Sequence, residues 1–288
     1  MMQELRLRLR AGADAKRAAD VLNEWIMTAG NITAYGAGIG SEITDGLRNA
    51  YLDWADALEL QLRALTLDAA VVAALHTERY WRIRTLDDDP RPYRLVDAEV
   101  KHQVAWLQAL LDDLNERLGR LAAAPGHLAV LDTNILLEFL PPDQVPWAEV
   151  LGLSPIRLVV PLRVVEELDA KKYARRADLA ERARRILPQL ETAIGKGGIP
   201  GQLRDGVTIE VPVDRGSRFR PMDADEEILD TCRELRQLTT QAVTLVTADT
   251  AMRLRAEAQA LAVTRLPDAY LRRPARMSAT NENERQPS

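Results

Sequence analysis

Four acidic residues follow apolar runs that read as strands, or lie in the helix that comes next. These residues are Asp132, Glu167, Asp225 and Asp249. The runs near the first and the last, residues 127–131 and 242–247, have the near-continuous apolar character of buried parallel strands. The carboxyl ends of parallel strands form the edge of a sheet at which ligands bind. The spacing therefore predicts that the four carboxylates meet at one edge.

Carboxylates gathered at one edge repel each other and raise one another's pKa unless a cation neutralises them. Oxygen ligands with little sulfur or imidazole nearby suit hard divalent ions, so we expect Mg²⁺ or Mn²⁺. N-capping is an alternative explanation for each Asp, because each one precedes a predicted helix. It does not explain Glu167, which lies inside a helix. The set therefore indicates a metal-dependent phosphodiesterase site.

Composition limits the class of protein. The 288 residues suffice for two domains, and 47% hydrophobic with 28% charged residues is typical of a globular chain. No uncharged apolar run of about 18 residues occurs, so we expect no membrane association. The single cysteine, Cys232, is expected to be a buried structural thiol. These features favour the reducing cytoplasm as the location.

The net charge of -5 does not favour a general nucleic-acid binder, which usually has a basic patch. Residues 171–185 are the exception, since they contain seven Lys or Arg against two acids. A basic helix beside an acidic metal site can hold a phosphate backbone, although a solvated helix face explains the same charges. The candidates for RNA binding are Lys171, Lys172, Arg175 and Arg176.

Residues 1–124 are expected to form a helical domain. Three stretches show a helical apolar period, at 15–28, 41–84 with a break near 66–67, and 96–123. One tryptophan falls in each helical segment, which predicts aromatic anchors of a bundle core. These are Trp25, Trp54, Trp81 and Trp106. This half has no recognisable catalytic group, so substrate positioning, a protein partner and self-association all remain open for it.

Helical periodicity stops at residues 122–126, and strands then alternate with helices, as in βαβ units. We expect an α/β/α domain at 125–270 with five parallel strands, and a disordered polar tail at 271–288. The strands are predicted at 128–131, 157–160, 207–211, 242–247 and 262–266. The helices are predicted at about 133–140, 164–173, 177–193, 225–238 and 250–260.

The second half resembles the PIN domain, the metal-dependent ribonuclease fold of toxin–antitoxin ribonucleases and of RNA-decay and rRNA-processing endonucleases. The resemblance spans about residues 128–266. It rests on four motifs in the same order as in the family, each at a strand end. These are LDTNILL at 131–137, VVPLRVVEELDAKK at 159–172, DADEEIL at 223–229 and LVTADTAMRLRA at 245–256.

The resemblance implies roles for individual residues. Asp132 matches the first metal-binding Asp of the family, Glu167 its Glu, and Asp225 and Asp249 the third and fourth acids. Asn134 and Thr247 match supporting polar positions, and Asp223 competes with Asp225 in the third motif. The implied activity is that of an endoribonuclease with Mg²⁺ or Mn²⁺ bound. Asp132 and Asp249 are expected to be direct ligands, and both one ion and two remain open.

Two other classes of protein compete with the enzyme. A PIN-fold module could bind RNA or protein without catalysis, but such a scaffold has no need to keep four repelling acids. A phosphotransferase of the HAD type needs a second Asp at position 134, which is Asn. A response regulator needs a Lys at the end of a late strand, where Pro267 follows instead. A free-standing toxin is usually little more than the PIN domain, so the long helical extension disfavours that role and its antitoxin partner.

Overall fold

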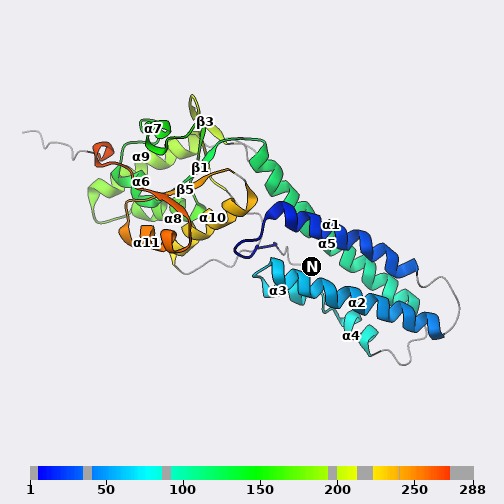
Figure 1. Ribbon diagram of the computed structural model, residues 1–288. Coiled ribbons are helices and arrows are strands. Elements are labelled where there is room, and N and C mark those ends of the chain that lie inside the picture. Colours follow the sequence, from blue (N-terminus) through cyan, green and yellow to red (C-terminus); the bar gives the residue numbers. More distant parts are fainter. Residues whose placement is uncertain are drawn as a thin grey trace, which may run out of the picture.

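The computed structural model describes residues 6–34, 41–85, 92–193, 200–212, 223–239 and 241–272. Figure 1 shows an elongated helical arm beside an α/β body. The long helices α1, α2 and α5 run side by side along the arm. The arm consists of α1 (Ala15–Ala34), α2 (Ser41–Leu65), α3 (Ala69–Ala73), α4 (Glu78–Arg84) and α5 (Pro92–Ala122). No described helix is long and apolar enough to cross a membrane.

The predicted break near residues 66–67 is confirmed. Helix α2 ends at Leu65, and the Asp68 side chain caps α3 by accepting a hydrogen bond from the Ala70 amide at 2.8 Å. Residues 6–10, for which no structure was expected, run beside the break. There the Arg10 amide donates to the Leu65 carbonyl at 2.8 Å, which ties the start of the described chain to the end of α2.

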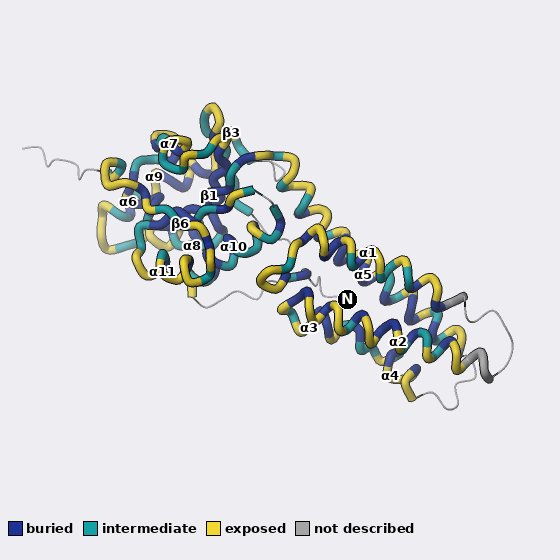
Figure 2. The backbone as a smooth tube through the Cα atoms, viewed as in Figure 1, coloured by how far each residue is buried: buried dark blue, intermediate teal, exposed yellow. Residues whose placement is uncertain are grey.

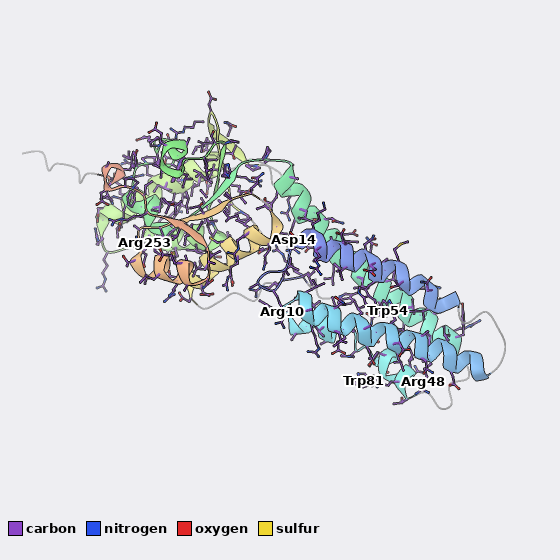
Figure 3. All side chains as sticks on the ribbon, viewed as in Figure 1. Arg10, Asp14, Arg48, Trp54, Trp81 and Arg253 are labelled. Atoms are coloured by element: carbon purple, nitrogen blue, oxygen red, sulfur yellow. The ribbon has the colours of Figure 1, made fainter. Side chains whose placement is uncertain are left out.

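The core of the arm is built from the facing sides of its helices, which are buried along their length (Figure 2). Trp54 and Trp106 lie in this core as predicted, but the prediction for Trp81 is wrong, since this side chain is 53% exposed. Figure 3 shows Trp81 at the part of the arm remote from the sheet. The short helix α4 buries Tyr80 and Ile83 instead, so Trp81 points away from the core.

A polar cluster lies inside the arm, around the fully buried carboxylate of Glu99. Thr77 Oγ1 donates to Glu99 Oε1 at 2.6 Å, and Gln103 Nε2 donates to the same atom at 2.8 Å. Arg79 Nε donates to Oε2 at 2.7 Å, and the Tyr51 hydroxyl lies 3.4 Å from Oε1. Glu99 is thus surrounded by donors, one of them a guanidinium, and it joins α2, α4 and α5.

The body contains a sheet in which six strands of the described chain are ordered β3-β4-β2-β1-β5-β6. The strands are β1 (His127–Leu131), β2 (Ile156–Val159), β3 (Gly201–Arg204), β4 (Val207–Glu210), β5 (Val243–Val246) and β6 (Ala262–Thr264). The five predicted strands are present and parallel. The prediction missed β3, which pairs antiparallel with β4 at the edge and contains one apolar side chain, Leu203.

Helices flank this sheet and complete the expected α/β/α architecture. They are α6 (Thr133–Glu138), α7 (Trp147–Leu151), α8 (Leu162–Lys171), α9 (Ala177–Ala193), α10 (Ala224–Leu238), α11 (Thr250–Ala258) and a final 3-10 turn (Asp268–Tyr270). Only α7 and the final turn were not predicted. The expected tail begins later than residue 271, because Leu271 pairs with Phe139, and residues 273–288 lie outside the described part of the chain.

Buried side chains of the body form one large cluster around β1, β2 and β5. Cys232 belongs to it, and burial raises the pKa of its thiol to about 12. This agrees with the predicted structural role. The buried Arg157 of β2 donates to the carbonyls of Leu121 and Ala124 and pairs with Glu210 at 2.7 Å. It therefore fastens the end of α5 to the sheet.

Helix α10 belongs to both halves of the molecule. Its last residue, Leu238, packs in the core of the arm, while most of its buried residues pack in the body. Arg6 pairs with Glu234 and Arg8 pairs with Asp230, and both of these acids are half-buried. Gln237 Nε2 adds a 2.8 Å hydrogen bond to the carbonyl of Arg10, which Figure 3 labels at this junction.

Candidate active site

The site is built where β1 and β5 end side by side. Leu131 pairs with Val246, so the residues that follow each strand, Asp132 and Thr247, are neighbours across the sheet. Thr247 Oγ1 donates to Asp132 Oδ2 at 2.8 Å and accepts from the Asp249 amide at 3.0 Å. One buried hydroxyl therefore connects the first and the fourth predicted acids.

Asp132 is only 4% exposed and lies at the N-cap position of α6, but its side chain makes no capping hydrogen bond. Capping therefore does not account for this residue. Burial raises the pKa of Asp132 to about 6, against the lowering effect of its bonds to Thr247 and to the Thr133 backbone. The charges of Asp225 and Glu167 raise it further. Among the described residues no Lys or Arg forms an ion pair with Asp132.

Asp249 does act as a helix cap. Its Oδ1 accepts from the Met252 amide at 2.9 Å at the start of α11. The capping alternative therefore holds for one oxygen of this side chain. The same bond fixes the orientation of the carboxylate beside Thr247.

Glu167 reaches the site from the middle of α8. Its Oε2 accepts from the Thr133 hydroxyl at 2.5 Å, and Thr133 directly follows Asp132. Arg163, one turn earlier on α8, lies 3.8 Å from Glu167 Oε1 and 3.7 Å from Glu166 Oε2. Thr133 thus lies beside Glu167, whereas Arg163 contacts both Glu166 and Glu167. The role of Thr133 was missed, and its place beside Asp132 was the available signal.

The third motif lies at the start of α10. Asp223 is the N-cap, because its side chain accepts from the Asp225 amide at 3.1 Å. Arg255 of α11 reaches both acids, at 3.0 Å from Asp223 Oδ2 and 3.6 Å from Asp225 Oδ2. Burial raises the pKa of Asp225, and Asp223 raises it further while Arg255 opposes the change. Weaker raising effects come from Asp249 and Glu167.

Thr247 contacts both Asp132 and the Asp249 amide, and Thr133, the residue after Asp132, contacts Glu167. The charges of Asp225 and Glu167 also raise the pKa of Asp132. Within the described residues, however, no three acid, His or Cys side chains lie close enough to enclose an ion. The donors are carboxylate and hydroxyl oxygens, which fit Mg²⁺ or Mn²⁺, and Asp132 is buried without a cation. The donor set therefore fits a hard divalent ion, and the side chains would have to turn inward to bind it. Asn134 is half-buried in the first turn of α6, two residues beyond Asp132.

The residues predicted to bind RNA lie at the end of α8 and in the turn after it. Lys171 and Arg175 are exposed. Lys172 pairs with Asp169 at 2.7 Å and Arg176 pairs with Asp178 at 2.9 Å, and in each case the bonded acid raises the pKa of the basic group. Two of these four basic residues are thus paired with acids, and three of the four, including the paired Arg176, are exposed.

One family model agrees with this architecture. The family model described as the PIN domain matches residues 129–266. Among solved structures, a domain of a functionally unknown protein from Methanocaldococcus jannaschii aligns at 16% identity and a TM-score of 0.32, covering 57% of this chain and 100% of that chain. No curated protein matches. Members of the matched family are generally nucleases, and the C-terminal half of this chain is a PIN domain.

Proposed function

We propose that this PIN domain is a Mg²⁺- or Mn²⁺-dependent endoribonuclease, with Asp132, Glu167, Asp225 and Asp249 as its acidic residues. The observation that supports this best is the state of Asp132. Its carboxylate is buried at the end of a central strand, and its hydroxyl partner Thr247 also binds the Asp249 amide. A buried acid that faces other acids needs a cation.

A divalent ion held there would supply an activated water and would neutralise charge that develops on the phosphodiester. Asp132 and Asp249 are the residues that would hold the ion. Thr247 keeps Asp132 oriented through Oδ2, and Thr133 keeps Glu167 oriented through Oε2. Asp225 enters from the start of α10 and can complete the site or accept a proton at a carboxylate oxygen. Both threonines therefore act by fixing carboxylates before substrate arrives.

The test is cleavage of a covalently closed circular RNA by the full chain in the presence of Mn²⁺. A circle has no ends, so its opening separates an endonuclease from an exonuclease. Asp132→Asn should abolish the opening. Asp205→Asn is the matched control, because Asp205 is exposed in the turn that precedes β4, at the opposite edge of the sheet.

A wild-type chain that binds RNA and Mn²⁺ but leaves circular and linear RNA intact would contradict the nuclease proposal. It would support the alternative of a PIN-fold module that binds RNA without catalysis. A chain that cuts DNA circles and not RNA circles would change the substrate class but not the assignment of the acids.

A further inference from the structure

Two arginines lie against the predicted acids from different helices, and neither was expected to take part in function. Arg163 of α8 contacts Glu166 and Glu167, and Arg255 of α11 contacts Asp223 and Asp225. Their side chains are 36% and 47% exposed. Each guanidinium is thus at once beside a site carboxylate and in contact with solvent.

These ion pairs are loose. The four distances lie between 3.0 and 3.8 Å, whereas a strong charged hydrogen bond between nitrogen and oxygen spans about 2.7–2.9 Å. Partly exposed pairs of this kind contribute little to stability. The contacts can therefore be exchanged when a stronger cation competes for the same carboxylates.

RNA faces an electrostatic barrier at this edge of the sheet, because the acids repel phosphate until a cation neutralises them. The basic segment after α8 offers exposed charge, but its Lys172 and Arg176 are engaged with Asp169 and Asp178. In the part of the chain that the structure describes, Arg163 and Arg255 are the cations paired with predicted site acids. Their planar donor groups suit the paired oxygens of a phosphate.

We propose that Arg163 and Arg255 form a phosphate-binding pair that divalent-ion binding releases. Without the ion, each arginine neutralises a site carboxylate. When the ion takes the carboxylates, both guanidinium groups turn to the RNA phosphates next to the bond to be cut. This inference rests on the proposed nuclease function, and it assigns the residues that hold the substrate at that site.

The proposal predicts that substitution of either arginine changes the affinities for Mn²⁺ and for RNA in opposite directions. An arginine that competes with the ion weakens ion binding, so Arg255→Gln should bind Mn²⁺ more tightly than the wild type does. The same substitution removes a phosphate contact, so it should weaken RNA binding once the ion is present. A residue that merely supports the fold would weaken both.

The experiment compares the full wild-type chain with Arg163→Gln, Arg255→Gln and the double variant. Calorimetry measures Mn²⁺ affinity without RNA, and fluorescence anisotropy measures the affinity for a labelled single-stranded RNA, in EDTA and in Ca²⁺. Ca²⁺ has the same preference for oxygen ligands and replaces the catalytic ion during the binding measurement. Arg63→Gln is the matched control, since Arg63 is an exposed arginine paired with Glu59 on the arm.

We expect each single variant to bind Mn²⁺ a few-fold more tightly and RNA in Ca²⁺ roughly 5- to 10-fold less tightly, as for the loss of one typical hydrogen bond. The salt dependence should become shallower by about 0.7 per arginine, the value for single-stranded nucleic acid. In EDTA the variants should differ little from the wild type. Arg255→Lys should recover part of the RNA affinity, because it keeps the charge and loses the paired donors.

Unchanged affinities in variants with a wild-type unfolding temperature would overturn the proposal, and so would a parallel loss of Mn²⁺ and RNA binding. A wild-type chain that binds Mn²⁺ but no RNA would refute the nuclease proposal, and the phosphate role with it. A wild type that cuts RNA while both arginine variants bind it equally well would refute the phosphate role alone.

Discussion

Each half of the molecule buries a carboxylate, and the surroundings of the two carboxylates differ in opposite directions. Glu99 in the arm is surrounded by the donors Thr77, Arg79 and Gln103, with the Tyr51 hydroxyl nearby. Asp132 in the body accepts hydrogen bonds from the Thr247 hydroxyl and the Thr133 backbone, while burial and the charges of Asp225 and Glu167 raise its pKa. A buried acid saturated by its own chain is architectural. One that faces further acids is, in the proposed function, a ligand for a cation from solution.

The difference between Asp132 and Glu99 should be largest in the rate of RNA cleavage. Asp132→Asn should reduce RNA cleavage in Mn²⁺ by at least about 100-fold, because it removes a charged ligand of the ion. Glu99→Gln should leave the cleavage rate of the folded protein within about 2-fold. Initial rates at a temperature well below unfolding provide the measurement. Equal losses in both variants would mean that the two acids do not differ in function.

For stability we expect the reverse, with Glu99→Gln and not Asp132→Asn lowering the free energy of unfolding. Glu99→Gln leaves Arg79 and Thr77 without their charged acceptor, so we expect the free energy of unfolding to fall by about 2 kcal/mol. This is below the range for a fully buried pair, because Arg79 is 39% exposed. Urea unfolding at pH 7.5 measures the change. Exposed Glu78, changed to Gln, serves as the control on the same side of the arm.

The effect of Asp132 on stability should depend on pH in metal-free protein. Its pKa is raised to about 6 in the folded state, above the unfolded value, so the fold binds this proton more tightly than the unfolded chain does. Stability therefore falls as pH rises from about 4 to about 6, and the penalty is complete above that range. Asp132→Asn should stabilise the protein by about 3 kcal/mol at pH 7.5 and by well under about 1 kcal/mol at pH 4.

That measurement is made by urea unfolding in EDTA across the pH range. A constant difference between wild type and Asp132→Asn would show that the carboxylate is not strained by burial. A destabilised variant at pH 7.5 would place Asp132 with Glu99, among the acids that the fold requires.

The smallest effect is expected from the basic segment after α8. Replacing Lys171, Lys172, Arg175 and Arg176 by Ala should weaken RNA binding only a few-fold and reduce its salt dependence, because fewer counterions are released. Lys171→Ala with Arg175→Ala should account for most of the change, since the other two side chains are paired with acids. An unchanged salt dependence would leave the segment as a solvated surface. Mn²⁺ affinity should not change in either variant.

The sequence predicted the parts of the fold that depend on local pattern. Strands β1, β2, β4 and β5 were located within a residue or two, because β1 and β5 are almost continuously apolar and β4 alternates apolar with polar residues. Strand β3 has no such pattern and exists through its pairing with β4. Residues 6–10 alternate leucine and arginine, but their partner near Leu65 is far away in the sequence.

The parts of the candidate site that follow a local pattern could also be predicted, and the contacts between separate helices could not. Asp132 and Asp249 could be found because they follow strands, and Thr247 because it lies between β5 and Asp249. The contacts of Arg163 follow the i,i+3 and i,i+4 spacing within α8, so the sequence contained that signal although it was not used. The contacts of Arg255 join α11 to the start of α10, which no local pattern reveals. The Glu99 cluster could not be predicted from the sequence, because its donors are distant in the chain, on or next to α2, α4 and α5.

Helix α10 makes the two halves difficult to exchange between proteins. It begins at the candidate site with Asp225 and ends with Leu238 in the core of the arm, and its outer side binds arginines from residues 6–8. A PIN domain transplanted from this chain onto another partner would bring Leu238, Asp230 and Glu234 to surfaces not shaped for them. The arm can therefore be replaced only together with the last turns of α10, whose first turn belongs to the candidate site. We therefore expect the two halves to have diverged as a unit.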